Sequence, residues 1–455
     1  MIICIFGKYP PIQGGVSMRT YWVAHGLAKL GHTVHVVTNA KEVALPYRMF
    51  MREEDWIRCE QRYDTGSVTV HWTEPYGRRQ WHIPDGGTFI TKLASVGLEL
   101  VRQQPIDLLY SHYVEPYCIA GHLVAQATKL PFVVRTAGSD AGRLWRLPQF
   151  AALYNHIFKS ADAVLCGPAV IPKMIEIGVK PTRVTSNPEK HVSLAELFAP
   201  DGPALDVQQL REQILNGEND EFRDSLFGSF QPSLNYFGVY GKLGETKGTY
   251  ALLAALKRMV ERGLQVGLLI MAHERPGEPS VFRAYARANG LENRVCQLPF
   301  LPHWRVPEFI RRCVAICCLE QDFPIKFHDP VVAREVLTCG ACLVGSSEVL
   351  HKLPAPLTLI GDDNCVEVTD VNNIEELEQK LTSVLEYPDR VKQIRRRARQ
   401  YGLEIEIGNT FPQRLESIFS DVVETRHLSA KNIRHDPTQL PNRALALEET
   451  ISPSR

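Results

Sequence analysis

The sequence predicts an α/β protein with two doubly wound parallel-sheet domains that face each other across a cleft. Short runs rich in β-branched residues alternate with segments of helical apolar spacing, which is typical of a parallel sheet covered by helices on both faces. This alternation lapses over residues 188–230 and then starts again. The chain has 455 residues, and a length of that order suits two or three domains of about 100–200 residues each.

The first alternating series defines domain one, over residues 1–190. Its predicted strands are continuous apolar runs, so both of their faces should be buried. Strands are predicted at 2–6, 33–38, 68–72, 107–111, 131–135, 163–166 and 183–186, and helices at 16–30, 87–103, 116–128 and 149–159. Ligands bind beyond the carboxyl ends of strands in such sheets, so the loops there are candidate sites.

Residues 191–230 are polar and are predicted to form a linker or insertion with one short helix near 206–215. Domain two follows over residues 231–405. Its strands are predicted at 234–240, 264–271, 294–298, 314–319, 341–345 and 357–360, and its helices at 248–262, 279–289, 306–312, 331–338 and 373–386.

The C-terminal region is helical and charged over 388–423 and contains the basic run Arg395-Arg396-Arg397. A solvated helix face is the plain interpretation of this run, and a patch for phosphate-bearing lipids is the alternative. Residues 406–424 are expected to form a helix that packs back on domain one. Residues 425–455 are polar and contain three prolines, so a disordered tail is expected.

Charge and hydropathy exclude several classes of protein. Lys plus Arg and Asp plus Glu both number 51, so net charge indicates no nucleic-acid partner. Residues 1–190 hold 21 Lys/Arg against 15 Asp/Glu, which leaves peripheral membrane contact through domain one open beside ordinary variation in surface charge. No apolar run approaches 18 residues, and the apolar N-terminus resembles a buried strand more than a signal peptide. We therefore expect a cytoplasmic protein, at most peripheral at the inner membrane face.

The eleven cysteines lie mostly inside apolar runs, which favours buried free thiols in a reducing compartment. Cys339-Gly-Ala-Cys342 has redox or zinc spacing, but no second pair at metal-like spacing follows it. We interpret this pair as structural.

One glycine-rich loop follows the first strand of each domain. The first ends in Gly14-Gly15 at a helix start, and the second runs Gly241-Lys242-Leu-Gly244-Glu-Thr-Lys247-Gly248. Glycines let the backbone approach a bulky anion, a helix N-terminus supplies free N–H groups, and Lys supplies a compact charge for phosphate oxygens. Neither loop is a dinucleotide fingerprint or a Walker A loop. Both are candidate diphosphate sites, with a tight turn and a solvated lysine turn as the alternatives.

A third loop ends at Pro330 and leads straight into a helix. Pro suits the first helical position, and the amides of Val331 and Val332 would be unpaired and available to an anion. Glu335 lies about one turn further on. It could accept hydrogen bonds from two adjacent ribose hydroxyls, or it could simply complement the helix dipole.

Together these residues resemble the retaining glycosyltransferases of family 4 (glycosyl transferases group 1), which have the GT-B fold of two Rossmann-like domains. The resemblance covers roughly residues 1–424. Its matching segments are Gly14-Gly15-Val16, His112, Arg135-Thr-Ala-Gly138-Ser139-Asp140, Tyr240-Gly241-Lys242 with Lys247-Gly248, and Glu335-Val-Leu-Thr-Cys-Gly340.

The resemblance implies a role for each segment. The residues expected to act in catalysis are Lys242 and Lys247 on the diphosphate, and His112 and Asp140 facing the transferred sugar or the acceptor. The residues expected to bind the donor are Gly14, Gly15, Leu301, His328, Asp329, Val331, Val332 and Glu335. The stretch 299–303 would hold the base, largely through backbone groups. A satisfied core histidine is the alternative for His112.

Two positions depart from the family pattern. The family places a first Glu eight residues before Glu335, where this chain has Phe327. The adjacent His328 and Asp329 are expected to contact the sugar hydroxyls instead, and Glu320 and Asp322 lie nearby. The His that often precedes Gly-Ser-Asp is Ala137 here. These changes leave the donor sugar open.

The activity that the resemblance implies is transfer of a sugar from a UDP-sugar or GDP-sugar to a hydroxyl acceptor, with retention of anomeric configuration. The acceptor could be a glycan, as in polysaccharide biosynthesis, a lipid-linked molecule or a small molecule. Charge develops on the leaving phosphate, so fixed cations and helix N-termini should carry catalysis. The sequence has no Asp-x-Asp motif, so neither a metal nor a cofactor is expected.

Three alternatives stay open at this point. A sugar-nucleotide 2-epimerase shares the fold. A glycosidase needs two carboxyls about 5–9.5 Å apart and would leave the phosphate loops unused. A catalytically degenerate scaffold or binding subunit would explain Phe327 and Ala137. On the acceptor side, loops 41–66 and 75–90 are expected to line the cleft, with plain surface loops as the alternative; they contain Tyr76, Arg78, Arg79, Trp81 and His82.

Overall fold

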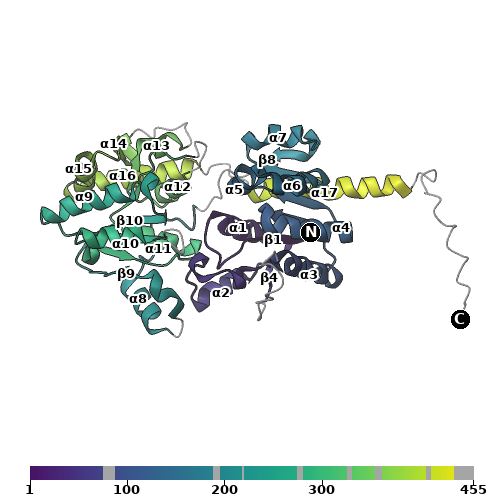
Figure 1. The fold of residues 1–455 in the computed structure, drawn as a ribbon, viewed down its shortest axis with the longest axis horizontal. Helices are drawn as coiled ribbons and strands as arrows, with labels where there is room; N and C mark the ends of the chain where they lie inside the picture. The colour runs from purple at the N-terminus through teal and green to yellow at the C-terminus, as the bar shows by residue number, and fades with distance from the viewer. Residues whose placement is uncertain are drawn as a thin grey trace, which may run out of the picture.

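The computed structural model describes residues 1–74, 88–187, 195–217, 220–273, 280–324, 330–353, 361–405 and 411–434. Two α/β domains lie side by side, domain one in purple to blue and domain two in green (Figure 1). The predicted fold class, two Rossmann-like domains, is confirmed.

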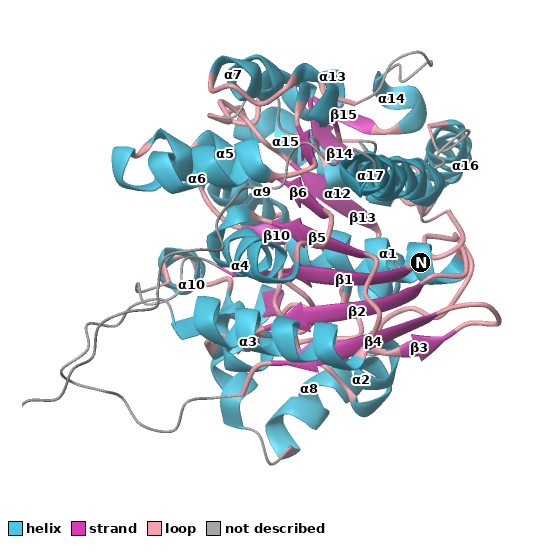
Figure 2. Ribbon diagram, turned by 90° about the vertical axis from the view of Figure 1, so that its right-hand side faces the viewer, coloured by secondary structure: helices cyan, strands magenta, loops and turns pink. Residues whose placement is uncertain are grey.

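Domain one is built on an eight-stranded sheet of order β3-β4-β2-β1-β5-β6-β7-β8 (Figure 2). Its strands are β1 (Ile2–Gly7), β2 (Thr33–Thr38), β3 (Gln61–Arg62), β4 (Ser67–Trp72), β5 (Leu108–His112), β6 (Phe132–Arg135), β7 (Ala163–Cys166) and β8 (Val184–Ser186). Its helices are α1 (Gly15–Lys29), α2 (Glu53–Cys59), α3 (Thr88–Gln103), α4 (Ile119–Thr128), α5 (Gly138–Gly142), α6 (Pro148–Ser160) and α7 (Ile171–Glu176). The pairs are parallel except at the edge, where β3 runs antiparallel to β4.

Domain two has a seven-stranded sheet of order β15-β14-β13-β10-β11-β12-β9. Its strands are β9 (Phe227–Gly228), β10 (Asn235–Lys242), β11 (Val266–His273), β12 (Val295–Gln297), β13 (Ala315–Cys318), β14 (Leu343–Ser346) and β15 (Val366–Val368). Its helices are α8 (Val207–Asn216), α9 (Thr249–Glu261), α10 (Val281–Ala288), α11 (Val306–Arg312), α12 (Val331–Thr338), α13 (Ser347–His351), α14 (Gly361–Asn364), α15 (Ile374–Glu386) and α16 (Pro388–Glu404). The strand predicted at 357–360 lies outside the described residues.

Strand β1 shows why the strands are continuous apolar runs. Ile3 and Ile5 pack with residues of α1, whereas Cys4 and Phe6 pack with residues of α3 and α4 on the other face. All four side chains are fully buried. A strand covered on both faces has no position left for a polar side chain, so the alternation of a half-exposed strand is lost.

The predicted linker is partly built into domain two. Leu210 and Ile214 of α8 lie in the domain-two core, and β9 pairs antiparallel with β12 at the sheet edge. Both sheets are therefore mixed at one edge, where a wholly parallel pattern was predicted. Antiparallel strands of two residues are too short to show a hydrophobic period.

The last helix, α17 (Phe411–Arg434), returns to domain one, and its end projects beyond the domain (Figure 1). Phe411, Leu415 and Phe419 are buried in the core beside α1. The helix runs to Arg434, so residues 425–434 of the predicted disordered tail are helical, and residues 435–455 lie outside the described residues. No Gly or Pro interrupts residues 413–434, which lets the helix continue.

Both sheets reverse their winding direction at a central pair, β1 with β5 in domain one and β10 with β13 in domain two. Open α/β sheets bind ligands at such points, beyond the carboxyl ends of the strands. No helix in the described ranges is both long and apolar enough to cross a bilayer.

Candidate functional site

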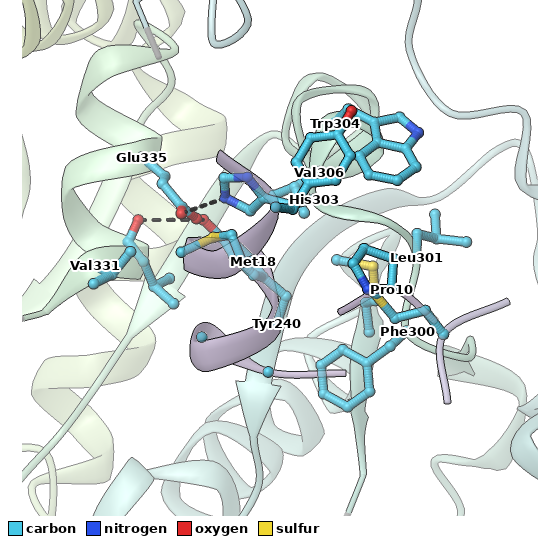
Figure 3. Close-up of a pocket in the computed structure, with 16 residues that line it drawn as sticks. Pro10, Met18, Tyr240, Phe300, Leu301, His303, Trp304, Val306, Val331 and Glu335 are labelled. Atoms are coloured by element: carbon cyan, nitrogen blue, oxygen red, sulfur yellow. Dashed lines mark hydrogen bonds and ion pairs between the residues drawn. The ribbon is translucent and has the colours of Figure 1, made fainter. Parts of the chain in front are cut away.

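A cavity of about 210 Å³ lies between the two domains. Domain one contributes Pro10, Gly14, Gly15, Met18, Tyr21 and Met49 to its wall. Domain two contributes Tyr240, Met271, Phe300, Leu301, His303, Trp304, Val306, Val331, Val332 and Glu335 (Figure 3). The predicted donor residues Gly14, Gly15, Leu301, Val331, Val332 and Glu335 therefore surround one space.

The domain-one wall is the start of α1. Gly14 has φ of +106°, a conformation that L side chains rarely adopt, and no side chain caps the first turn of the helix. A Cβ placed on Gly14 or Gly15 would meet no atom within 4 Å. The glycines therefore leave open space in front of the helix N-terminus, where free N–H groups and the positive dipole end favour an anion.

The domain-two wall is the start of α12. Pro330 precedes the helix, and among the described residues no side chain caps its first turn. Val331 and Val332 line the same cavity as Gly14 and Gly15. Two uncapped helix N-termini, one from each domain, therefore face a single cavity.

The Glu335 carboxylate is held by two side chains and linked through one of them to domain one. Its Oε2 accepts a hydrogen bond from the Tyr240 hydroxyl at 2.8 Å, and its Oε1 lies 2.7 Å from His303 Nε2. His303 Nδ1 accepts from Trp22 Nε1 of α1 at 3.0 Å. Because an indole N–H only donates, Nδ1 carries no proton, and Nε2 is the nitrogen that donates to Glu335. Burial, then the neighbouring Glu335, raises the pKa of Tyr240 well above its usual value, so its hydroxyl stays a donor.

The rest of the cavity wall is mainly apolar. Its apolar lining includes Met18, Met49, Met271, Phe300 and Trp304. An apolar pocket with a few convergent polar groups is the usual form of a small-molecule site. The carbonyl of Phe300 accepts the Phe50 amide of domain one at 2.7 Å, so this part of the predicted base-binding stretch already bonds between the domains.

The loop between β10 and α9 requires its glycines. Gly241, Gly244 and Gly248 have φ of +113°, +147° and +68°. A Cβ on Gly248 would lie 2.5 Å from the Leu319 carbonyl oxygen, so the loop fits closely against the chain after β13. Lys242, at the end of β10, is exposed and is not among the residues that line the cavity.

Lys247 is paired in this structure. Its Nζ forms an ion pair with Glu320 Oε1 and lies 3.9 Å from the centre of the Phe323 ring. Glu320 also lies 3.8 Å from Lys352 Nζ. Glu320 therefore positions the predicted diphosphate lysine, and no local sequence pattern indicates this role beyond its nearness to Glu335.

His112 lies below the surface of domain one, in a cationic surrounding. It is buried, and its Nδ1 lies 3.2 Å from Thr20 Oγ1. Burial, then the charges of Arg135, Arg19 and Lys8, lower its pKa well below the usual value, so the ring is neutral. This burial is compatible with both interpretations of His112, a core histidine and a residue facing the transferred sugar.

Asp140 ties together the turns after β5 and β6. Its carboxylate accepts the amides of Val114 at 3.0 Å, Ala137 at 2.8 Å and Ala141 at 2.7 Å. Burial raises its pKa to about 6 in spite of these bonds. Neither Asp140 nor His112 is among the described residues that line the cavity with Glu335.

Several predicted site residues fall outside the described residues. They are Phe327, His328 and Asp329 near the donor, and Tyr76, Arg78, Arg79, Trp81 and His82 on the acceptor side. Among the described residues no cluster of His, Cys, Asp and Glu could hold a metal ion, and Cys339 and Cys342 are buried free thiols.

Family models match both domains. Residues 14–188 match the glycosyl transferase 4-like domain, and residues 227–401 match the glycosyl transferases group 1. No curated protein sequence matches the chain.

Solved structures share the two-domain fold. Anabaena HepE in complex with UDP and glucose has a TM-score of 0.58 at 16% identity, over 92% of this chain and 100% of HepE. A glycosyltransferase from Rickettsia africae gives 0.55 at 13% identity, over 93% and 98%. Sucrose-phosphate synthase from Thermosynechococcus elongatus gives 0.52 at 13% identity, over 95% and 99%.

Proposed function

The chain belongs to the glycosyl transferases group 1, with the GT-B fold, and we propose that it moves a sugar from a nucleoside-diphosphate sugar to a hydroxyl acceptor with retention of anomeric configuration. The observation that carries the proposal is the pair of uncapped helix N-termini that face one interdomain cavity. A diphosphate between α1 and α12 would meet free N–H groups from both sides.

The proposed donor pose assigns the ribose to Glu335. Hydrogen bonds from Tyr240 and His303 fix the carboxylate in the cavity wall. Each carboxylate oxygen keeps a further lone pair, so two adjacent ribose hydroxyls could donate to it. The apolar surface around Met18, Met49 and Phe300 would then contact the base or the sugar.

The proposed chemistry is displacement of the nucleoside diphosphate by the acceptor hydroxyl. Negative charge develops on the leaving phosphate, and the two helix N-termini with Lys242 and Lys247 would stabilise it without a metal ion. Lys247 can keep Glu320 as a partner, because its ammonium has three donors. Loss of one such contact typically lowers the rate about 100- to 1,000-fold.

The first experiment is a thermal-shift panel with UDP, GDP, ADP and CMP. The HepE structures contain UDP and UDP-glucose, so UDP is the first nucleotide to test. A nucleotide at about 100 times its Kd should stabilise the native state by roughly 2.7 kcal/mol. The shift should be lost in Lys247→Ala. In Glu335→Gln we expect affinity to fall about 10- to 100-fold, since hydrogen bonds to a charged acceptor are worth about 1.5–3 kcal/mol.

The control is Glu375→Gln, an exposed carboxylate on α15, which should bind like the wild type. If no nucleoside diphosphate shifts the melting temperature, the donor site is inactive and a scaffold role replaces the proposal. With the matching sugar nucleotide, NMR of the product assigns the stereochemistry. An inverted anomeric centre would refute retention, and sugar interconversion without an acceptor would indicate an epimerase.

A further inference from the structure

A second cavity, of about 650 Å³, lies on domain two between α11, α16 and residues 200–204. We call it the basic groove, after the five cationic residues in its wall: Arg311, Lys392, Arg395, Arg396 and Arg399. The described lining residues include no Asp or Glu. The remaining lining includes the apolar side chains of Ile310, Cys313, Cys339 and Ala341.

Three of the five cationic side chains donate hydrogen bonds to backbone carbonyls. Arg311, Arg395 and Arg399 donate at 2.8–3.1 Å to the backbone carbonyls of Ala195, Phe198, Ala199, Pro203 and Val314. Arg399 also donates to the Thr338 carbonyl, which covers the negative end of α12. Arg311 and Arg399 attach the interdomain segment to domain two, whereas Arg395 bonds within domain two. A guanidinium has five N–H donors, so donors remain on each of them.

Lys392 and Arg396 have no comparable structural role. Both are exposed and lie four residues apart on α16. Lys392 pairs with Asp389 at 3.0 Å, but the two side chains are 74% and 89% exposed, and such pairs contribute little. In the part of the chain that the structure describes, Arg396 makes no hydrogen bond or ion pair. Like charges four residues apart repel on a helix, so this arrangement is costly unless an anion neutralises it.

We propose that the basic groove binds a soluble phosphate ester of an organic molecule. Guanidinium groups match phosphate oxygens in bidentate geometry, and the apolar floor can accept the carbon skeleton of the ester. Small-molecule sites have volumes of about 300–1,000 Å³, and the groove lies within that range. A concave wall favours a discrete ligand over the flat surface of a bilayer.

The basic groove is separate from the interdomain cavity. Val331 at the start of α12 lines the interdomain cavity, whereas Cys339 and Gly340 just after its end line the groove. A helix of eight residues is about 12 Å long. The proposal therefore does not rest on the proposed function, and either can fail alone.

The test is calorimetric titration of phenyl phosphate into the full chain and its variants. Lys392→Ala/Arg396→Ala should lower affinity at least tenfold while leaving the fold intact, because neither side chain supports the backbone. Arg397→Ala is the matched control, since Arg397 belongs to the same run but pairs with Asp363 at 2.6 Å and does not line the groove. It should bind like the wild type. Lys247→Ala should also bind normally, because Lys247 does not line the groove.

Three outcomes overturn the proposal. The first is no binding of phenyl phosphate, or equal affinity in the wild type and the double variant. Either result would mean that the cations of the groove have only a structural role. The second is loss of binding in Lys247→Ala, which would place the phosphate in the interdomain cavity. The third is sedimentation with phosphatidylglycerol vesicles, but not phosphatidylcholine vesicles, in the absence of phenyl phosphate binding. That result would make the ligand a lipid headgroup.

Discussion

His303 connects the two walls of the interdomain cavity through a single ring. Its Nδ1 accepts from Trp22 of domain one, and its Nε2 donates to Glu335 of domain two. The bond from Trp22 fixes which nitrogen carries the proton, and that proton holds the carboxylate in place. If the domains separate, the first bond is lost and the second is no longer enforced. The acceptor for the proposed ribose is thus formed best when the domains are paired.

A different histidine gives the protein a dependence on pH. His25 is buried between Tyr9, 3.0 Å from its Nε2, and Tyr63, 2.7 Å from its Nδ1. Burial, then the charge of Lys29, lowers its pKa to about 3. The unfolded chain has a histidine pKa near 6.5, so it binds more protons than the native state below that pH. The stability that His25 contributes is therefore complete above pH 6.5 and is lost as pH falls towards 3.

Between pH 7 and pH 5 this loss should be about 2 kcal/mol in the free energy of unfolding. Urea unfolding at the two pH values measures it. His25→Gln should be less stable at pH 7, but its difference between the two pH values should be smaller by that amount. The same substitution at the exposed His427 serves as the control. An unchanged pH difference in His25→Gln would show that the ring is not the titrating group.

At the scale of helices and strands, continuous apolar runs predicted the long strands well. Strands such as β1 and β10 are buried on both faces, and their apolar residues mark them in the sequence. The edge strands β3, β9 and β15 have two or three residues, too few for a period. The helix start at Val331 was predicted because proline, here Pro330, favours the first position of a helix.

The convergence of Gly14, Gly15, Val331 and Glu335 on one cavity followed from loops at the carboxyl ends of strands. The bonds that join the domains could not be predicted in the same way. Trp22 and His303 are 281 residues apart, and Asp55 and Trp304 are 249 apart. No local sequence pattern predicts such pairs, because they depend on how the two folded domains pack against each other.

Helix α17 is an element whose contribution can be measured. Phe419 is fully buried in the domain-one core, with its ring 5.2 Å from that of Tyr110. Phe419→Ala should reduce the free energy of unfolding by about 3–5 kcal/mol, because a cavity replaces the ring. Leu428→Ala, on the same helix but 62% exposed, should change it by no more than about 0.5 kcal/mol. Equal effects in urea unfolding would mean that α17 does not stabilise domain one.

On the scale of the whole molecule, two domains of like winding each supply one helix N-terminus to a shared cavity. Neither wall forms the proposed donor site alone, so donor binding there would depend on the pairing of the domains. Trp304 of domain two contacts domain one in that pairing. Its Nε1 donates to Asp55 at 2.6 Å, and its ring lies 4.7 Å from that of Tyr21 in the domain-one core.

Trp304→Ala should therefore loosen the pairing while each domain keeps its own core. Core Trp→Ala changes cost about 3–5 kcal/mol, and here part of that loss falls on the interface. We expect calorimetry to resolve two unfolding transitions, small-angle scattering to show a larger radius of gyration, and nucleotide affinity to fall. Trp56→Ala, which removes a ring that contacts Trp72 edge to face within domain one, should change neither the radius of gyration nor the nucleotide affinity. If Trp304→Ala kept wild-type affinity and dimensions, the domains would be held together by other contacts, and the bond from Trp22 to His303 would become the next one to remove.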